Sequence, residues 1–130
     1  MTMQITATYA AILAIYFVIL SNVVSITRGK LKTPIGDGDN IALSVIIRRH
    51  ANFAEAVPFA LIVMAMAEVG GLAAPWVHAL GVLLLAARLI HPFGMTEANP
   101  IGRLRIVGAV GTHIVTVAAS LAILAQNFLM

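Results

Sequence analysis

Three polar side chains recur at helical spacing in an otherwise apolar part of this sequence. Arg48, Asn52 and Glu55 stand at positions i, i+4 and i+7, and a rotation of about 100° per residue places them on one narrow face of a helix. A guanidinium binds carboxylates through parallel hydrogen bonds, and a carboxylate binds ammonium groups. The pattern therefore indicates a pocket for a small zwitterionic or anionic ligand. The alternative is a buried Arg–Asn–Glu network that only fixes helix packing.

A second polar set follows further along the chain. Arg88 and His91 have the spacing i, i+3, and Arg103 and Arg105 follow a loop that contains Pro100. One interpretation is that these arginines anchor the chain at a membrane surface. In the other, one arginine points into the pocket and stabilises an anion such as a thiolate.

Composition decides which elements carry these residues. Of the 130 residues, 61% are hydrophobic and 10% are charged, whereas a soluble domain has about a quarter charged residues. A membrane-crossing helix needs about 20 apolar residues, and without alternating polarity a closed barrel is disfavoured. The sequence predicts an all-α integral membrane four-helix bundle, one domain over residues 1–130. The expected transmembrane helices span residues 3–27, 41–68, 75–93 and 101–128.

The basic residues predict the orientation. Every Lys and Arg lies within 28–49 or 88–105, and four spans place both regions on one side of the membrane. By the positive-inside rule that side is cytoplasmic, so both termini are non-cytoplasmic and we expect a multi-pass protein of the bacterial inner membrane. The net charge of +3 then reflects topology, and no nucleic-acid partner is expected.

Other residue types exclude several kinds of site. The absence of cysteine excludes disulfides, thiolate metal sites and a cysteine nucleophile. The four histidines have no metal-ligand spacing, so no metal site is expected. His113 lies deep in the fourth span and is expected to form an interhelical hydrogen bond, while Gly108 and Gly111 predict close helix packing.

The polar cluster is expected to lie inside the membrane, where its charges are energetically costly. Glu55 precedes Glu68, which we expect at the far interface, by 13 residues, or about 20 Å of helix. An ionised carboxylate inside the membrane is costly unless it is paired or hydrated. Pro58 is expected to loosen the helix just beyond the cluster.

These motifs together resemble a known family. With Arg48-x3-Asn52-x2-Glu55-x2-Pro58 in the second of four spans, Gly36-Asp-Gly38 before it and Arg88-x2-His91 after it, the sequence resembles the MAPEG family, membrane-associated proteins in eicosanoid and glutathione metabolism. It is most similar to the bacterial branch of that family. The resemblance covers nearly the whole chain.

The resemblance implies a homotrimer that binds glutathione between subunits near the cytoplasmic face. By matching position, the motif on the second span holds the γ-glutamyl part, and His50 and Arg28 lie near the glycine carboxylate. Either Arg103 or Arg105 stabilises the thiolate, which attacks a lipophilic electrophile or reduces a lipid hydroperoxide entering from the bilayer. The expected glutathione-binding residues are Arg28, Arg48, His50, Asn52, Glu55, Arg88 and His91, and the expected catalytic residues are Arg103 and Arg105.

The sequence also departs from the family pattern. Positions at which the resemblance implies tyrosines carry Ala56, His91 and Met95, and the only tyrosines, Tyr9 and Tyr16, lie in the first span. His91 is a possible replacement for one of them. Two hypotheses therefore stand: a glutathione-dependent transferase or peroxidase, and a non-catalytic protein of the same fold that binds a lipid headgroup, a small anion or a protein partner. A small multidrug transporter is disfavoured, since its essential carboxylate would lie in the first span, which has none.

Overall fold

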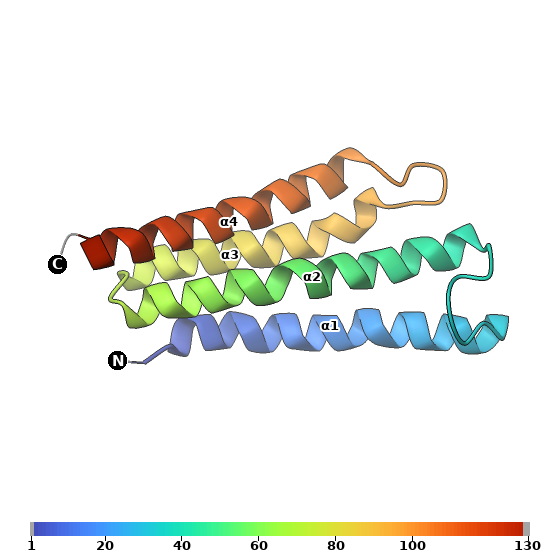
Figure 1. Cartoon of the computed structure of the whole chain (residues 1–130), viewed down its shortest axis with the longest axis horizontal. Helices are drawn as coiled ribbons and strands as arrows, with labels where there is room; N and C mark the ends of the chain where they lie inside the picture. Colours follow the sequence, from blue (N-terminus) through green and yellow to red (C-terminus); the bar gives the residue numbers. More distant parts are fainter. Residues whose placement is uncertain (1, 129–130) are drawn as a thin grey trace.

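The structure, a computed structural model, describes residues 2–128 and contains four long helices. The helices run lengthwise beside one another, and the first helix begins at the same end of the molecule at which the last helix finishes (Figure 1). Each is long and apolar enough to cross a membrane, which confirms the predicted all-α, four-span fold. The elements are α1 (Gln4–Leu31), α2 (Ile41–Val69), α3 (Ala74–Ile90), the short 3-10 helix η1 (His91–Gly94) and α4 (Arg103–Phe128).

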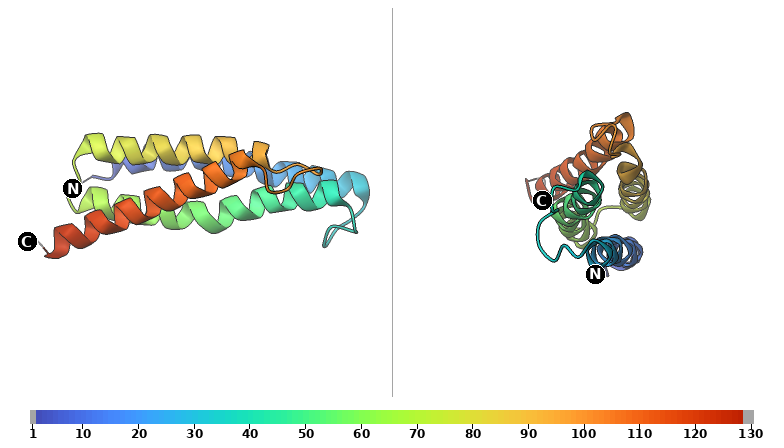
Figure 2. Two further views of the ribbon diagram at one scale, coloured as in Figure 1. Left: turned by 90° about the horizontal axis from the view of Figure 1, so that it is seen from above. Right: turned by 90° about the vertical axis from the view of Figure 1, so that its right-hand side faces the viewer.

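The helices form a diamond when the molecule is viewed along its length. α2 and α3 each pack against both α1 and α4, which occupy opposite corners (Figure 2). The core along the axis is apolar and draws on all four helices. Its fully buried large side chains include Leu13, Met64, Leu84 and Val115.

The ends of three helices differ from the predicted spans. α1 continues through Gly29 to Leu31, because no proline interrupts it before Pro34, and it ends where Lys32 adopts a left-handed φ of 53°. α3 ends as an α-helix at Ile90, since Pro92 has no N–H to continue the ladder. α4 begins at Arg103, two residues later than predicted, because residues 100–101 form a turn.

The end that carries the basic residues is held together by loop contacts. Asn40 caps α2, its side chain accepting from the Leu43 N–H at 3.0 Å. In the same loop Asp37 accepts hydrogen bonds from the Ser44 hydroxyl and the Asp39 N–H. These hydrogen bonds, that of Ser44 foremost, lower the pKa of Asp37.

Small residues bring α3 and α4 into close contact, as the sequence predicted. A Cβ on Gly108 would lie 2.6 Å from the Ala87 carbonyl oxygen, and one on Gly111 would lie 2.9 Å from the Ala87 Cβ. By contrast, α2 stays α-helical through Pro58, so the expected loosening is not seen in its secondary structure.

Candidate functional site

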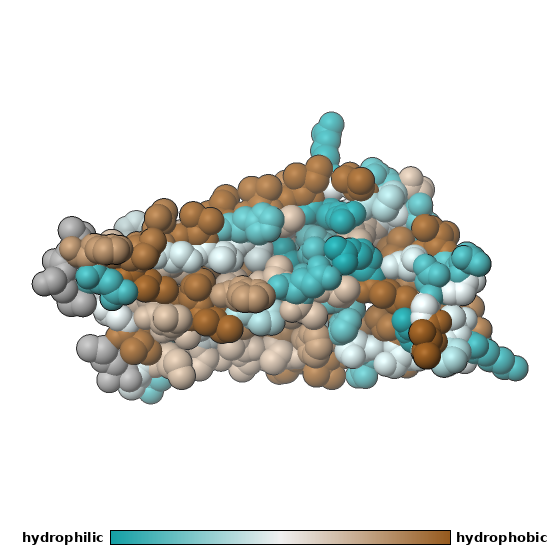
Figure 3. All heavy atoms as spheres, in the orientation of Figure 1, coloured by the Kyte–Doolittle hydropathy of each residue, from teal (hydrophilic) through white to brown (hydrophobic). Residues whose placement is uncertain are grey.

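Arg48 and Glu55 lie together on the outer face of α2. Arg48 Nη1 donates to Glu55 Oε1 at 3.1 Å, and the two side chains are 50% and 57% exposed. Large exposed side chains on the same helix, such as Phe59 and Ile62, are apolar. Figure 3 shows hydrophilic side chains gathered over α2 and α4 near mid-length, with hydrophobic side chains on either side. The pair is therefore not part of a buried packing network.

Asn52 is turned from this pair toward the interior. Its side-chain oxygen accepts from Arg88 Nη1 at 3.1 Å, and Arg88 Nη2 donates to the Gly108 carbonyl at 2.7 Å. Arg88 is only 2% exposed, so it joins α2, α3 and α4 inside the bundle. Burial rules out the alternative in which Arg88 anchors the chain at lipid headgroups. The three residues predicted to share one face therefore have different partners: Arg48 and Glu55 pair on the outside, and Asn52 forms a hydrogen bond inside the bundle.

Two further expected ligand residues, His91 of η1 and His50 of α2, also point inward. His91 is 2% exposed, and its Nε2 has no hydrogen-bond partner among residues 2–128. His50 is half-buried, with its ring centroid 4.9 Å from that of Phe17. Neither histidine forms a hydrogen bond with Arg48 or Glu55 in the described chain, and His91 is buried whereas that pair is exposed.

Among the remaining arginines, Arg28 and Arg105 hold loops in place, whereas Arg103 has no partner in the described chain. Arg28 Nη1 donates to the Gly36 carbonyl at 2.6 Å, which closes the loop after α1. Arg105 Nη1 donates to the Pro100 carbonyl at 2.6 Å, which fixes the turn before α4. Arg103 is exposed and makes no hydrogen bond or ion pair within the described chain. It lines a hollow of about 350 Å³ together with Thr96 and Asn99.

His113 does not behave as predicted. It is exposed near the middle of α4, beside a hollow of about 370 Å³ whose other walls include Val110, Ile114 and Val117. No side chain of the described residues bonds to it, so the expected interhelical hydrogen bond within this chain is wrong. An imidazole facing outward from an apolar span requires water or a polar partner from outside the chain.

Sequence reasoning missed the role of Glu68. Its carboxylate accepts the backbone N–H groups of Ile5 at 3.0 Å and Thr6 at 2.8 Å, so it caps the N-terminus of α1 and complements the positive end of that helix dipole. Nearby, the Tyr9 hydroxyl lies 3.2 Å from His78 Nδ1. The available signal was an acidic residue at the end of one span facing the start of another.

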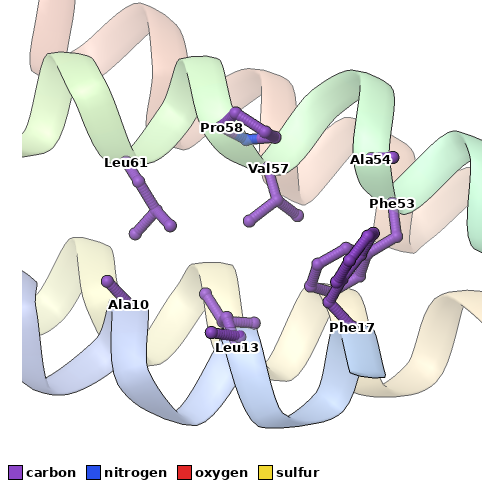
Figure 4. Close-up of a pocket in the computed structure, with 9 residues that line it drawn as sticks. Ala10, Leu13, Phe17, Phe53, Ala54, Val57, Pro58 and Leu61 are labelled. Atoms are coloured by element: carbon purple, nitrogen blue, oxygen red, sulfur yellow. The ribbon is translucent and has the colours of Figure 1, made fainter. Parts of the chain in front are cut away.

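An apolar hollow between α1 and α2 was also missed. It measures about 430 Å³, and Figure 4 shows Leu13 and Phe17 of α1 opposite Phe53, Val57 and Leu61 of α2. Sequence spacing shows which face is apolar but not where two apolar faces fail to fill the space between them.

These features define a class: a multi-pass α-helical membrane protein with an exposed ion pair on its second helix. The MAPEG family profile matches residues 6–125, and the chain belongs to this family. It is 34% identical over 91 residues, 70% of each chain, to the inner membrane protein YecN of Escherichia coli strain K12, and equally to YecN of Escherichia coli O6:H1 strain CFT073. No solved structure matches the chain significantly.

Proposed function

We propose that this protein binds glutathione at the Arg48–Glu55 pair and uses its thiol on lipophilic substrates. The observation that carries the proposal is the half-exposed ion pair on an otherwise apolar face of α2. Ion pairs inside a membrane are costly and are associated with function. Here the pair does not join two helices, because both partners belong to α2.

The charges of the pair match the γ-glutamyl end of glutathione. That end carries one carboxylate and one ammonium group, which suit the Arg48 guanidinium and the Glu55 carboxylate respectively. Binding then replaces one ion pair by two of the same kind, so neither protein charge is left unpaired. A simple anion would satisfy only Arg48.

Arg103 is the better candidate for the arginine that stabilises the thiolate. Arg105 is occupied by the Pro100 carbonyl, whereas the Arg103 guanidinium is exposed and without a partner in residues 2–128. A guanidinium beside a thiol favours its ionised form. Within the described part of one chain Arg103 forms no hydrogen bond or ion pair with Arg48 or Glu55, so we propose that the site is completed between copies in a homotrimer. The outward-facing His113 supports such a contact.

The chemistry follows from the thiolate. In transfer, its sulfur attacks an electrophilic carbon of the lipophilic substrate, and the leaving group departs with its electron pair or the adduct is protonated. In peroxidase chemistry, two glutathione molecules are oxidised to the disulfide while the hydroperoxide becomes an alcohol and water. Both reactions take their substrate from the bilayer around the helices.

The proposed setting is a bacterial inner membrane with the basic end in the cytoplasm. The relatives from Escherichia coli carry the name inner membrane protein. All eight Lys and Arg residues lie in the half of the bundle away from the chain ends, which by the positive-inside rule is cytoplasmic. Glutathione would then reach the site from the cytoplasm.

Calorimetric titration of the detergent-purified protein with glutathione tests the proposal. Glu55→Gln keeps the side-chain shape but removes the charge that holds the ammonium, so we expect at least a tenfold weaker dissociation constant. Glu97→Gln, in the exposed loop, is the matched control and should bind as the wild type does. Glutathione lacking its thiol should still bind. Absence of binding at millimolar glutathione, or equal binding by Glu55→Gln, contradicts the proposal.

A non-catalytic role at the same pair is the second candidate. At the positions where family resemblance implies tyrosines, His91 and Met95 are 2% and 1% exposed and Ala56 has no hydroxyl. These positions therefore offer no hydroxyl to a thiol on the outer face. Binding of glutathione without faster turnover of a chromogenic electrophile or a lipid hydroperoxide would favour this candidate, as would binding of a lipid headgroup in its place.

A further inference from the structure

A further hollow, which we call the basic-end hollow, lies within a single bundle and is lined by neither member of the outer pair. It measures about 200 Å³ and is walled by Tyr16, Leu20 and Val23 of α1, Arg49 of α2 and Phe93 of η1. It exists because α3 ends as an α-helix at Ile90, while α1 and α2 continue beyond that end (Figure 1). At this level α3 therefore no longer packs against α1 and α2.

Two polar groups line the basic-end hollow with unused hydrogen-bond donors. Arg49 donates from Nε and Nη2 to the Met95 carbonyl, with 3.1 Å for the Nε bond, and its Nη1 has no partner in the described chain. The Tyr16 ring packs edge-on against Phe53, with centroids 5.7 Å apart, yet no hydrogen bond of its hydroxyl occurs among residues 2–128. Neither atom is among the buried atoms without a partner, so both donors are accessible to a ligand in the hollow.

Positive charge near this hollow also lacks a carboxylate. Arg49 and Arg88 both donate to neutral oxygens, and the one ion pair of the described chain joins Arg48 to Glu55. Among residues 2–128, buried Arg88 Nε and His91 Nε2 have no hydrogen-bond partner, and His91 directly precedes Pro92 in the wall of the hollow. Uncompensated cations are costly away from water, so an anion from outside the chain would relieve this imbalance.

The residues at the mouth of the hollow indicate the chemical character of the rest of the ligand. Val23 and Phe93 line the hollow and are 43% and 72% exposed, so its mouth is apolar. The volume is below the roughly 300 Å³ at which pockets for drug-sized ligands begin. The hollow suits a small head group and the first carbons of a hydrocarbon chain. The remainder of that hydrocarbon chain would lie against the apolar surface of the helices.

We propose that the basic-end hollow binds a fatty carboxylate. The carboxylate accepts from Arg49 Nη1 and from the Tyr16 hydroxyl, and the acyl chain leaves past Val23 and Phe93 into the bilayer. This site is distinct from the proposed glutathione site, because it is formed by the interior of one bundle rather than by the outer face of α2.

Octanoate titration of the detergent-purified full chain, followed by thermal unfolding, tests this proposal. Octanoate should raise the melting temperature in a saturable manner, and octanol and octylammonium should not. Tyr16→Phe keeps the ring against Phe53 but removes one donor to a charged group, so we expect about tenfold weaker binding. Tyr9→Phe alters the other tyrosine of the same helix and should leave octanoate binding unchanged.

Four outcomes with the wild type and Tyr16→Phe would overturn the proposal. They are absence of saturable stabilisation by octanoate, equal stabilisation by octylammonium, wild-type octanoate affinity in Tyr16→Phe, and tighter binding of octyl phosphate, which would assign the head group to a phospholipid. Glu55→Gln separates the two sites: it should keep octanoate binding while losing glutathione binding. Loss of octanoate binding in Glu55→Gln would instead place octanoate on the outer face and would also overturn the proposal.

Discussion

The two ends of the bundle use polar residues differently. At the end where the chain begins and finishes, the Glu68 carboxylate accepts two N–H groups of α1, and Tyr9 contacts His78. At the basic end, Arg48 and Glu55 pair on an exposed face, Arg103 is free, and Tyr16 lacks a hydrogen bond in the described chain. Polar groups at the first end serve the fold, whereas several at the basic end, namely Arg48, Glu55, Arg103 and Tyr16, are not used to hold the loops or join the helices and are available to ligands.

The tyrosines of α1 show the same contrast on one helix. Tyr9 is 9% exposed and closes a polar contact between α1 and α3. Tyr16 lies two turns further along and lines the basic-end hollow. Their chemistry is identical, so the difference comes from α3, which is present beside Tyr9 but ends at the level of the hollow.

The largest effect on stability is expected at the tight contact that positions Arg88. Gly108→Val would place a branched side chain where a Cβ already lies 2.6 Å from the Ala87 carbonyl oxygen, and overpacking of this kind costs about 3 kcal/mol. Thermal unfolding in detergent should show a lower melting temperature. Gly29→Ala, where nothing lies within 4 Å of the added Cβ, should show no loss; an equally stable Gly108→Val would refute the observed contact.

A smaller loss is expected at the end that serves the fold. Glu68→Gln removes the negative charge at the N-terminus of α1 and leaves one acceptor oxygen for two N–H groups, which should cost about 1 kcal/mol. Denaturant or thermal unfolding would measure this, and glutathione binding should be unchanged. Weaker glutathione binding with unchanged stability would reverse the assignment of roles to the two ends.

Arg105 and Arg103 should affect different properties: Arg105 the stability of the protein, and Arg103 the pKa of the bound glutathione thiol. Arg105→Ala loses its bond to the Pro100 carbonyl and should lower stability by about 1 kcal/mol. Arg103→Ala should leave stability unchanged but raise the pKa of the bound glutathione thiol, because the guanidinium no longer favours the thiolate. The ultraviolet absorbance of the thiolate against pH measures this shift. A raised thiol pKa in Arg105→Ala alone would assign the role to Arg105.

The smallest effects concern the two tyrosine hydroxyls. Tyr9→Phe removes the contact with His78 and should destabilise the ligand-free protein by about 1 kcal/mol. Tyr16→Phe should have almost no effect on the ligand-free protein, because its hydroxyl has no partner to lose in the described chain. Melting temperatures of both variants without ligand check this, and a greater loss in Tyr16→Phe would mean that its hydroxyl is already used by the fold.

Much of the fold could be predicted from periodicity and composition. Runs of apolar residues defined the four helices to within a few residues, and the spacing of Arg48 and Glu55 placed them on one face, as observed. Gly108 and Gly111 correctly indicated a close helix contact. These features depend on residues near one another in sequence or on residue size alone.

The inward turn of Asn52 and His91 could not be predicted. Asn52 lies on the same helical face as Arg48 and Glu55, but at its edge, and only the position of α3 decides that it meets Arg88. The burial of His91 depends on the approach of α4 through Gly108. Likewise, the basic-end hollow depends on where α3 ends relative to α1 and α2. The role of the site residues in glutathione binding stays a prediction.

The most direct test of the central claim is thermal unfolding of the wild type and Arg48→Ala across a glutathione titration. A ligand at about 100 times its dissociation constant adds about 2.7 kcal/mol to the stability of the folded state. The account predicts a saturable rise in melting temperature for the wild type and none for Arg48→Ala, with similar melting temperatures in the absence of glutathione. No rise for the wild type at millimolar glutathione, or the same rise for Arg48→Ala, would contradict it.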